Sequence, residues 1–332
     1  MTNLQGSTIM VAGGAGFVGS AIVRELLDQD INVVCFDNYL HGVPTNVNRI
    51  KGPLTIVHGD ASNTHSLMEC LLNNNVDYII NCIGDTFVPT AYEMPDRFFD
   101  INLGVCLNIL KAADTCKIKR VLYISSTEVY GITDLPVLDE HVALAPVNTY
   151  AVSKLAADRL CYTFHLEHQT PVITARIFNC YGPRETEPYI VPEIIYQLNK
   201  SNTLKLGNIK AQRDFTYVHD TAKALIAVLA SDIPNGDVVN VGSNVSYSVE
   251  WLAFKIAEIM EVKDLNLEID QDRIRKLDIN RFRCDNTKLK KYTNWEPTVD
   301  IEEGLKRTVD WFKANSCTWS WESFVEGVRI YR

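Results

Sequence analysis

The chain has 332 residues, of which 46% are hydrophobic and 22% charged, with a formal net charge of −9. The length predicts more than one small core, and the acidic balance argues against general nucleic-acid binding, which usually needs a basic surface. No apolar run approaches the roughly 20 residues of a membrane span, and there is no signal-peptide pattern, so we expect a cytoplasmic protein without membrane contact. The nine cysteines form no C-x-x-C pair, and we expect them to be reduced thiols.

Apolar runs of strand length alternate with helical patterns in the first half of the chain. The expected strands are Thr8–Ala12, Val33–Asp37, Leu54–His58, Tyr78–Cys82, Val121–Ser125 and Val172–Ile177. The expected helices are Ser20–Gln29, Thr64–Asn73, Arg97–Cys116 and Thr149–His168. This repeated βα order predicts an α/β fold with a Rossmann-type, doubly wound parallel sheet.

The regular alternation of strands and helices ends after Arg176. Prolines and glycines cluster in residues 181–192, and later helices alternate with short strands; these helices are expected at Asp220–Ala230, Ser248–Met260 and Ile301–Ala314. We expect residues 1–177 to form a dinucleotide-binding domain, to which residues 211–245 return. Residues 178–332 should form mainly a smaller α/β substrate-binding lobe.

A glycine-rich loop follows the first strand and opens a helix. Gly13, Gly16 and Gly19 have the spacing G-x-x-G-x-x-G, with Phe17 and Val18 between the last two. Glycines allow a tight turn and close approach to a pyrophosphate, and the helix N-terminus supplies unpaired N–H groups and partial positive charge. The loop therefore predicts a dinucleotide site.

Two acids follow the next strands. Asp37 ends the second strand, 18 residues after Gly19, where a carboxylate can accept from both ribose hydroxyls and repel a 2′-phosphate. We therefore expect NAD rather than NADP. Asp60 fits a contact to adenine, or alternatively the N-cap of the following helix. The adjacent Asn38 and Ala61 are assigned to the same site.

Tyr150 and Lys154 lie four residues apart, on one face of a predicted helix. A lysine ammonium and an oxidised nicotinamide both favour the phenolate, so we expect them to make Tyr150 a base near neutral pH. Ser126, at the end of a buried strand, can hydrogen-bond the same substrate oxygen.

Several further motifs carry a resemblance to a known family. The chain resembles the extended short-chain dehydrogenases/reductases of the NAD-dependent epimerase/dehydratase kind, which act on nucleotide sugars. The motifs are R-I-F-N-C-Y-G-P at residues 176–183, R-D-F-T-Y-V-H-D at 213–220, N-V-G-S at 240–243, Asp285, and W-E-P at 295–297.

The resemblance implies roles for the matching residues. Ser126, Tyr150 and Lys154 would be the catalytic group, and Asn179 would bind the sugar or diphosphate. It also implies a homodimer formed through the helices Arg97–Cys116 and Thr149–His168.

Three more contacts to the nucleotide sugar are implied, each with an alternative. Arg213 and Arg275 would meet the diphosphate, but Arg213 could instead pair with Asp214 or Asp220, and Arg275 could belong to a solvated charged face. Thr86 would contact the sugar or cap a helix.

The sequence also departs from the family pattern. The segment Asn81–Gly84 replaces H-x-A-A, Val105-Cys106 replaces G-T, and Gly207-Asn208-Ile209 replaces G-D-G. These changes touch the cofactor wall and a loop near the substrate, so they bear on substrate identity more than on the fold.

Glu128 separates the reactions of the family. Simple 4-epimerases need no acid there, whereas a 4,6-dehydratase must remove the C5 proton and expel the C6 hydroxyl. Thr127-Glu128 resembles the hydroxyl-then-glutamate pair of GDP-mannose-type dehydratases and glucuronate decarboxylases. We therefore expect dehydratase chemistry on an NDP-hexose, with Thr127 and Glu128 in the catalytic site. A 4-epimerase, a UDP-glucuronate decarboxylase and a Glu128 that merely pairs with a lysine or backbone amide are the alternatives.

Other readings of the chain are less favoured. A net reductase is disfavoured by Asp37, and a non-catalytic dinucleotide sensor by the retained Tyr150 and Lys154. His165 and His168 have the i, i+3 spacing of a metal pair but no evident third ligand, so we expect a solvated helix end. His219 is interpreted as structural.

Overall fold

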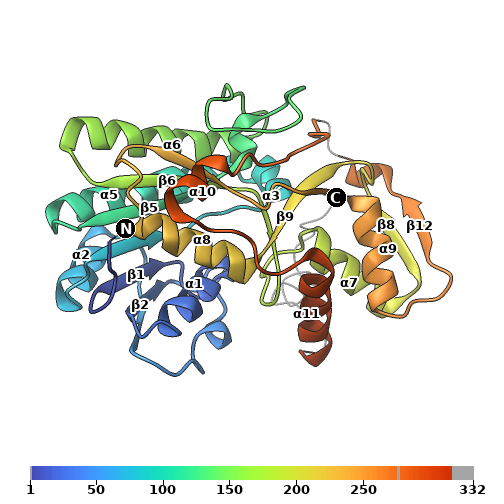
Figure 1. The fold of residues 1–332 in the computed structure, drawn as a ribbon, viewed down its shortest axis with the longest axis horizontal. Helices are drawn as coiled ribbons and strands as arrows, with labels where there is room; N and C mark the ends of the chain where they lie inside the picture. Colours follow the sequence, from blue (N-terminus) through green and yellow to red (C-terminus); the bar gives the residue numbers. More distant parts are fainter. Residues whose placement is uncertain (1, 275–276, 316–332) are drawn as a thin grey trace.

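The computed structural model describes residues 2–274 and 277–315, drawn as a ribbon in Figure 1. Its larger part is built on a seven-stranded parallel sheet with the order β10-β6-β5-β4-β1-β2-β3. From β1 the strands extend to one side as β2 and β3, and the chain then crosses to the other side of β1 to form β4. This change of side confirms the predicted doubly wound arrangement. The strands are β1 (Thr8–Ala12), β2 (Asn32–Asp37), β3 (Leu54–His58), β4 (Tyr78–Asn81), β5 (Arg120–Ser126), β6 (Val172–Ile177) and β10 (Val238–Val241).

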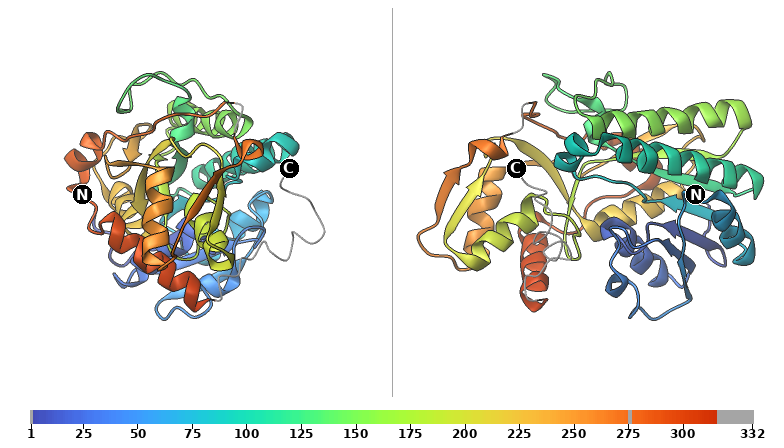
Figure 2. Two further views of the ribbon diagram at one scale, coloured as in Figure 1. Left: turned by 90° about the vertical axis from the view of Figure 1, so that its right-hand side faces the viewer. Right: turned by 180° about the vertical axis from the view of Figure 1, so that it is seen from behind.

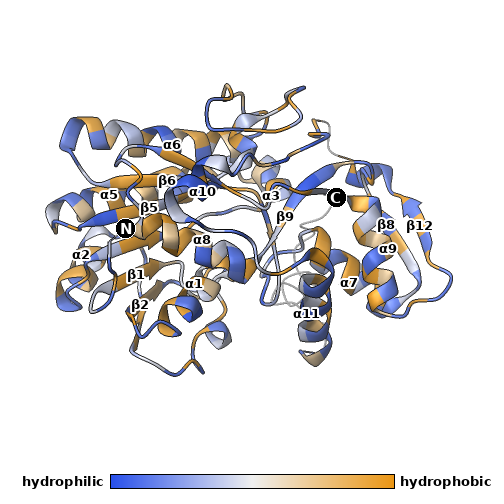
Figure 3. Cartoon of the chain, viewed as in Figure 1, coloured by the Kyte–Doolittle hydropathy of each residue, from blue (hydrophilic) through white to orange (hydrophobic). Residues whose placement is uncertain are grey.

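Helices cover both faces of this sheet (Figures 1 and 2). In β1, Ile9 and Val11 pack against one helical layer, and Met10 and Ala12 against the other, because successive strand residues point to opposite faces. Both sets are apolar, so β1 is buried on both faces, and the neighbouring strands are mainly hydrophobic (Figure 3). The first layer holds α1 (Phe17–Leu27), α8 (Val218–Ala230) and α10 (Thr287–Thr293); the second holds α2 (Thr64–Asn73), α5 (Val105–Thr115) and α6 (Thr149–His168).

A smaller lobe with its own core lies at the right of Figure 1. A three-stranded sheet of order β11-β9-β7 adjoins it, and a parallel pair β12-β8 completes it. The strands are β7 (Asn179–Tyr181), β8 (Thr203–Leu206), β9 (Gln212–Tyr217), β11 (Ser246–Ser248) and β12 (Asn266–Ile269). The helices are α7 (Ile190–Lys200), α9 (Val249–Ile259) and α11 (Ile301–Ala314). Residues 211–245 contribute β9 here, and α8 and β10 to the larger part; the domain boundaries themselves stay a prediction.

The expected single helix Arg97–Cys116 is wrong in detail. The segment begins as α4 (Pro95–Phe99), passes through a π-helical turn η2 (Asp100–Gly104) and continues as α5. In the π turn, buried Asn102 donates from Nδ2 to the Asp85 carbonyl oxygen at 3.0 Å and to Ser153 Oγ at 2.9 Å. A π turn shifts the helix face by one residue, and here it coincides with this link between the loop after β4 and α6. Hydrophobic periodicity does not report such a shift.

The remaining short elements join these parts. They are η1 (Pro44–Asn46), α3 (Val88–Glu93), η3 (Thr127–Tyr130) and η4 (Gln271–Arg273). Of these, η3 matters most for the site, because it turns the chain directly after the end of β5.

Candidate active site

A cavity of about 1470 Å³ lies at the carboxyl ends of the parallel strands, with walls from both parts of the molecule. This is where open α/β sheets bind ligands. The predicted site residues within the described ranges all line it, and Arg275 lies outside those ranges. They are Gly13, Gly16, Phe17, Val18, Gly19, Asp37, Asn38, Asp60, Ala61, Thr86, Ser126, Thr127, Glu128, Tyr150, Lys154, Asn179 and Arg213.

The glycine loop leaves the N-terminus of α1 open. Gly16 is the N-cap without a side-chain cap, and the first turn holds no acidic residue. Gly13 has a φ of +77°, and a Cβ on Gly19 would lie 2.1 Å from the Gly13 carbonyl oxygen. The helix starts at Phe17, three residues earlier than predicted. Its free N–H groups and partial positive charge therefore fit a pyrophosphate, and with it a dinucleotide such as NAD.

Asp37 is tied to the glycine loop as well as to the cavity. Its Oδ2 accepts from Ala15 N at 2.9 Å and its Oδ1 from Tyr39 N at 2.7 Å. Burial raises the pKa of this carboxyl, and the two backbone hydrogen bonds oppose that rise. The carboxyl is thus held in one orientation where the predicted ribose contact would form.

Asp60 does not cap the following helix. The N-cap of α2 is Asn63, whose Oδ1 accepts from His65 N and Ser66 N. Asp60 instead accepts from Ser62 N at 2.8 Å, a bond that lowers its pKa, and from Asn38 Nδ2 at 3.4 Å. The capping alternative is therefore wrong, and Asp60 is left facing the cavity beside Asn38.

Tyr150 is buried in an aromatic setting. Its ring lies edge-on to Phe98, with centroids 6.2 Å apart. Burial raises the pKa of the phenol; a hydrogen bond with Ser126 lowers it, and the nearby charge of Glu128 raises it further. The net direction is upward, and the expected lowering of this pKa by Lys154 together with an oxidised nicotinamide stays a prediction.

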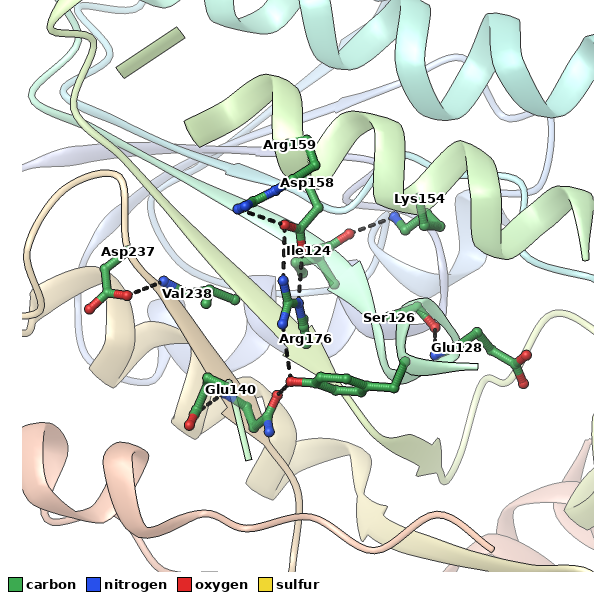
Figure 4. Close-up of polar contacts among 12 residues, drawn as sticks. Ile124, Ser126, Glu128, Glu140, Lys154, Asp158, Arg159, Arg176, Asp237 and Val238 are labelled. Carbon is green, nitrogen blue, oxygen red and sulfur yellow. Dashed lines mark hydrogen bonds and ion pairs between the residues drawn. The ribbon is translucent and has the colours of Figure 1, made fainter. Parts of the chain in front are cut away.

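The ammonium of Lys154 is bound to neutral groups. Its Nζ donates to the Ile124 carbonyl oxygen at 2.5 Å and lies 4.8 Å from the centroid of the Tyr123 ring. Burial lowers its pKa to about 8, because a buried ammonium loses hydration that these neutral partners replace only in part. Figure 4 shows Lys154 directed toward Ile124 of β5.

Glu128 is positioned by the start of α6. Ser126 Oγ accepts from Glu128 N at 3.2 Å, which shapes the turn η3. Asn148 caps α6 through Oδ1, which accepts from Ala151 N at 2.8 Å, and its Nδ2 donates to Glu128 Oε2 at 3.2 Å. The partner of Glu128 is thus a side-chain amide, so the lysine or backbone alternative is wrong. Its carboxylate points away from Ser126 in Figure 4.

A buried polar network fixes α6 from below (Figure 4). Arg176 donates from Nε and Nη2 to the two carboxylate oxygens of Asp158, at 2.9 and 3.2 Å. Its Nη1 donates to the Tyr130 hydroxyl at 3.2 Å, which in turn donates to Asn240 Oδ1 at 2.7 Å. Asn240 N donates to Glu140 Oε1 at 2.8 Å. The network joins α6, β6 and β10 and holds the helix that carries Tyr150 and Lys154.

The far wall belongs to the smaller lobe. Arg213 Nη2 lies 3.2 Å from Asp278 Oδ1, and Asn208 Nδ2 donates to Asp278 Oδ2 at 2.8 Å. Asp214 is occupied by the backbone N–H groups of residues 243, 244 and 284, and Asp220 by those of residues 298 and 299. The alternative that Arg213 pairs with either of these acids is therefore wrong.

Thr86 reaches across to the same wall. Its hydroxyl is hydrogen-bonded to the Tyr189 hydroxyl, and α3 has Phe87 as an N-cap without a side-chain bond. The helix-capping alternative for Thr86 is therefore wrong.

Sequence reasoning missed several residues of the cavity wall: Tyr189, Glu185, Arg273 and Asp278. They lie in loops or short turns without a periodic signal, and Asp278 is 65 residues from Arg213. The partner of Glu128, Asn148, could have been found, since asparagine just before a predicted helix is a capping signal.

The remaining candidates lie outside the cavity. His165 Nδ1 is 3.0 Å from the Thr170 carbonyl oxygen, and His219 Nδ1 is 2.7 Å from Glu25 Oε1. Within residues 2–274 and 277–315, no three His, Cys, Asp or Glu side chains gather as a metal site would need, the eight cysteines are free thiols, and no helix has the length and apolarity to cross a membrane.

The sequence of this chain matches the GDP-mannose 4,6 dehydratase family over residues 10–308. The chain belongs to the NAD-dependent epimerase/dehydratase family acting on nucleotide sugars. The predicted family is thereby confirmed, and so is the prediction of an enzyme.

Relatives in the epimerase/dehydratase family include enzymes of three reaction types. UDP-N-acetyl-alpha-D-glucosaminuronate decarboxylase of Bacillus cytotoxicus is 30% identical, over 92% of this chain and 97% of that protein. The solved UDP-N-acetylglucosamine 4-epimerase of Methanobrevibacter ruminantium is 30% identical, with a TM-score of 0.84 and coverage of 95% and 100%. The dTDP-glucose 4,6-dehydratase DesIV of Streptomyces venezuelae, solved with NAD and TYD, is 26% identical, with a TM-score of 0.88 and coverage of 94% and 99%. The comparisons therefore establish the family, but these relatives catalyse different reactions and do not identify the reaction of this chain.

Proposed function

We propose that this protein oxidises C4 of an NDP-hexose and carries the 4-keto sugar through a 4,6-dehydration. The observation that carries this proposal is Glu128, a carboxyl in the wall of the cavity beside Ser126 and Tyr150. Its orientation is set by Asn148, the cap of the helix that also carries Tyr150. A 4-epimerase has no use for a positioned acid at this place.

The cofactor in this proposal is NAD, which when bound would supply a hydride acceptor for the oxidation at C4 and a hydride donor for the later reduction. The open N-terminus of α1 would hold the pyrophosphate, and Asp37 would accept from the ribose hydroxyls. A buried carboxylate at that position disfavours the additional phosphate of NADP.

Tyr150 would remove the proton of the C4 hydroxyl, with Ser126 bound to the same oxygen. Burial, with the nearby charge of Glu128, raises the pKa of this phenol. A positively charged nicotinamide in the cavity would favour the phenolate, as would a protonated Lys154. Lys154 keeps its tie to Ile124 and positions the group from behind.

Glu128 would then act at C5 and C6. The C4 ketone acidifies the C5 hydrogen, and Glu128 takes it as a proton. The same carboxyl returns a proton to the C6 hydroxyl, which leaves as water, and a C5–C6 double bond forms. Return of the hydride to C6 and of a solvent-derived proton to C5 would then give the 4-keto-6-deoxy sugar. Asn148 holds Glu128 for both transfers, and Thr127 lines the cavity next to it.

The nucleotide sugar would lie against the smaller lobe. Asn179 and Thr86 would contact the sugar, and Arg213 the diphosphate. Arg213 faces the cavity while bound to Asp278, so its charge is oriented before a diphosphate arrives. Arg273 is a further cation of the cavity wall, held by Glu193 at 2.7 Å.

A decarboxylase is the second candidate, favoured by the 30% identical decarboxylase of Bacillus cytotoxicus. That reaction needs a C6 carboxylate, which a 4-ketone turns into a β-keto acid that loses carbon dioxide.

The purified protein should be incubated with NAD and a panel of nucleotide sugars, and the product masses followed. Loss of one water from a neutral hexose supports the proposal. Loss of carbon dioxide from a uronic acid supports the decarboxylase, and an unchanged mass with a new retention time supports an epimerase. Run in heavy water, a dehydration places a solvent deuteron at C5, whereas simple epimerisation at C4 does not.

Glu128→Gln tests the role of the residue directly. Product formation should fall by about 10²- to 10³-fold, because the amide cannot exchange the proton. Glu140→Gln is the matched control, since Glu140 accepts a backbone hydrogen bond in the network beneath α6, which an amide oxygen can also accept. Equal rates for wild type and Glu128→Gln would remove Glu128 from the mechanism.

A further inference from the structure

Glu185 is a buried acid that the proposed mechanism does not use. It lies in the loop between β7 and α7, and its side chain lines the cavity although the residue is only 5% exposed. Its Oε2 has no hydrogen-bond partner among residues 2–274 and 277–315. A buried polar atom left without a partner costs on the order of 1–3 kcal/mol, so native structures rarely leave one without a reason.

Among residues 2–274 and 277–315, no cation acts on the carboxyl of Glu185. Burial raises the pKa of its carboxyl well above the usual range, opposed only by a hydrogen bond from the Gly182 backbone N–H. Its neighbours include the Cys180 thiol and the Tyr189 phenol, both neutral groups whose pKa values are raised mainly by burial. Burial without a nearby cation favours the protonated carboxyl, which offers both a donor and an acceptor to the cavity.

Glu185 lines the same cavity as the glycine loop, and its neighbours include Cys180 and Tyr189. Cys180, close enough for the charge of Glu185 to raise its pKa, packs against the same core as Phe17 and Val18, which open α1 after the glycine loop. Tyr189 is influenced by both Glu185 and Tyr150. Glu185 thus faces the cavity together with Cys180 and Tyr189, and the glycine loop and Tyr150 line the same cavity.

We infer, resting on the proposed use of NAD, that Glu185 is a further cofactor-binding residue that pairs with the carboxamide of the nicotinamide. A carboxyl O–H can donate to the amide oxygen while the carboxyl oxygen accepts from the amide N–H. A primary amide presents its donor and acceptor side by side, as this pairing requires. A pyrophosphate offers acceptors only and needs a cation, and the part of the chain that the structure describes places none at Glu185.

Binding of NAD and of ADP-ribose tests this inference, because ADP-ribose keeps the adenosine, pyrophosphate and ribose but lacks the nicotinamide. Both ligands should be titrated by calorimetry into wild type, Glu185→Leu and Glu185→Gln, after bound nucleotide has been removed. Glu185→Leu should weaken NAD binding by about 10-fold or more, since two hydrogen bonds are lost. Its binding of ADP-ribose should stay within about 2-fold of wild type.

Glu185→Gln is the matched variant, because an amide also offers a donor and an acceptor; it should bind NAD within about 3-fold of wild type. Unchanged ADP-ribose binding also shows that Glu185→Leu is folded. Equal weakening of both ligands would overturn the inference, as would NAD binding that no variant changes. A rise in KM for the nucleotide sugar with unchanged NAD binding would assign Glu185 to the sugar instead. A wild type that binds neither nucleotide would overturn both this inference and the proposed use of NAD.

Discussion

Two polar regions meet helix α6 one turn apart, and they differ in how completely their groups are satisfied. Asp158, on the buried face of the helix, is fully buried and receives two hydrogen bonds from Arg176, which also binds Tyr130. Lys154, one turn earlier, is almost as buried, yet its ammonium has a carbonyl oxygen and an aromatic face rather than an acid. Burial alone does not separate the two regions.

Polar groups in the cavity wall differ from those of the Arg176 network in the same way. Thr127 Oγ1 and Glu185 Oε2 are buried and lack hydrogen-bond partners in the described part of the chain. In the Arg176 network the polar groups meet each other, whereas in the cavity they are left for a ligand. The Arg176 network holds the helix in place, and the unpaired groups of the cavity are available for chemistry. Mutations in the network should therefore lower stability, whereas mutations in the cavity should lower activity.

The largest effect should come from Tyr150→Phe. We expect kcat to fall by about 10³-fold or more, because the substrate hydroxyl loses its base, while the free energy of unfolding stays within about 1 kcal/mol of wild type. Product formation and urea unfolding measure the two quantities. Activity within tenfold of wild type would place the base elsewhere.

Asp158→Asn should show the reverse pattern. Removing one partner leaves Arg176 charged and buried, so the free energy of unfolding should fall by about 3 kcal/mol or more. Urea unfolding measures this loss. The double variant Asp158→Leu, Arg176→Met removes both charges and should recover part of the stability. A single variant as stable as wild type would mean that the network contributes little.

These contrasts also mark how far the sequence could predict the molecule. The strands β1, β3 and β6 and the helices α2, α6 and α11 have the predicted bounds, because apolar alternation and periodicity are local signals. The glycine loop, Tyr150 and Lys154 could be assigned because their spacing carries their chemistry.

Other features depend on what surrounds a side chain in three dimensions. The π turn at Asp100–Gly104 and the tie of Lys154 to Ile124 arise only once α6 is packed on β5. The unpaired carboxyl of Glu185 has no sequence signal at all, since an acid in a Pro- and Gly-rich loop usually meets solvent.

Lys154→Met should change the free energy of unfolding in the direction opposite to Asp158→Asn. In the folded protein, burial holds the pKa of Lys154 at about 8, below its ordinary 10.5, so the unfolded chain binds more protons between these pH values and wild-type stability rises with pH across them. At pH 7 the variant lacks this buried charge, and its free energy of unfolding should exceed that of wild type by about 1 kcal/mol.

The gain should shrink from pH 8 to 10.5, as the wild-type lysine loses its proton in the folded state. Urea unfolding at several pH values checks this course, and activity should be lost throughout. A variant less stable than wild type at pH 7 would show that Lys154 belongs with the closed network.

The outer face of α6 extends the comparison to an apolar surface. Val152, Tyr162 and Leu166 are 40%, 42% and 56% exposed and lie on one side of the helix. We propose that α6 and α5 pair with their copies in a homodimer. Light scattering should give twice the chain mass for wild type and a lower mass for Tyr162→Glu, Leu166→Glu; a monomeric wild type would refute the dimer.

The short interval between β6 and β7 has a mechanical consequence. Only Phe178 separates the two strands, which belong to different sheets, and this residue is buried with its N–H bound to the Val241 carbonyl oxygen at 2.9 Å. A hinge needs freedom in its backbone torsions, and the burial of Phe178 and its hydrogen bond to Val241 restrict that freedom. Asn179 is therefore carried rigidly by the strand that Arg176 locks to α6. Any opening of the smaller lobe must bend the chain elsewhere and leave the alignment of Asn179 with Tyr150 intact.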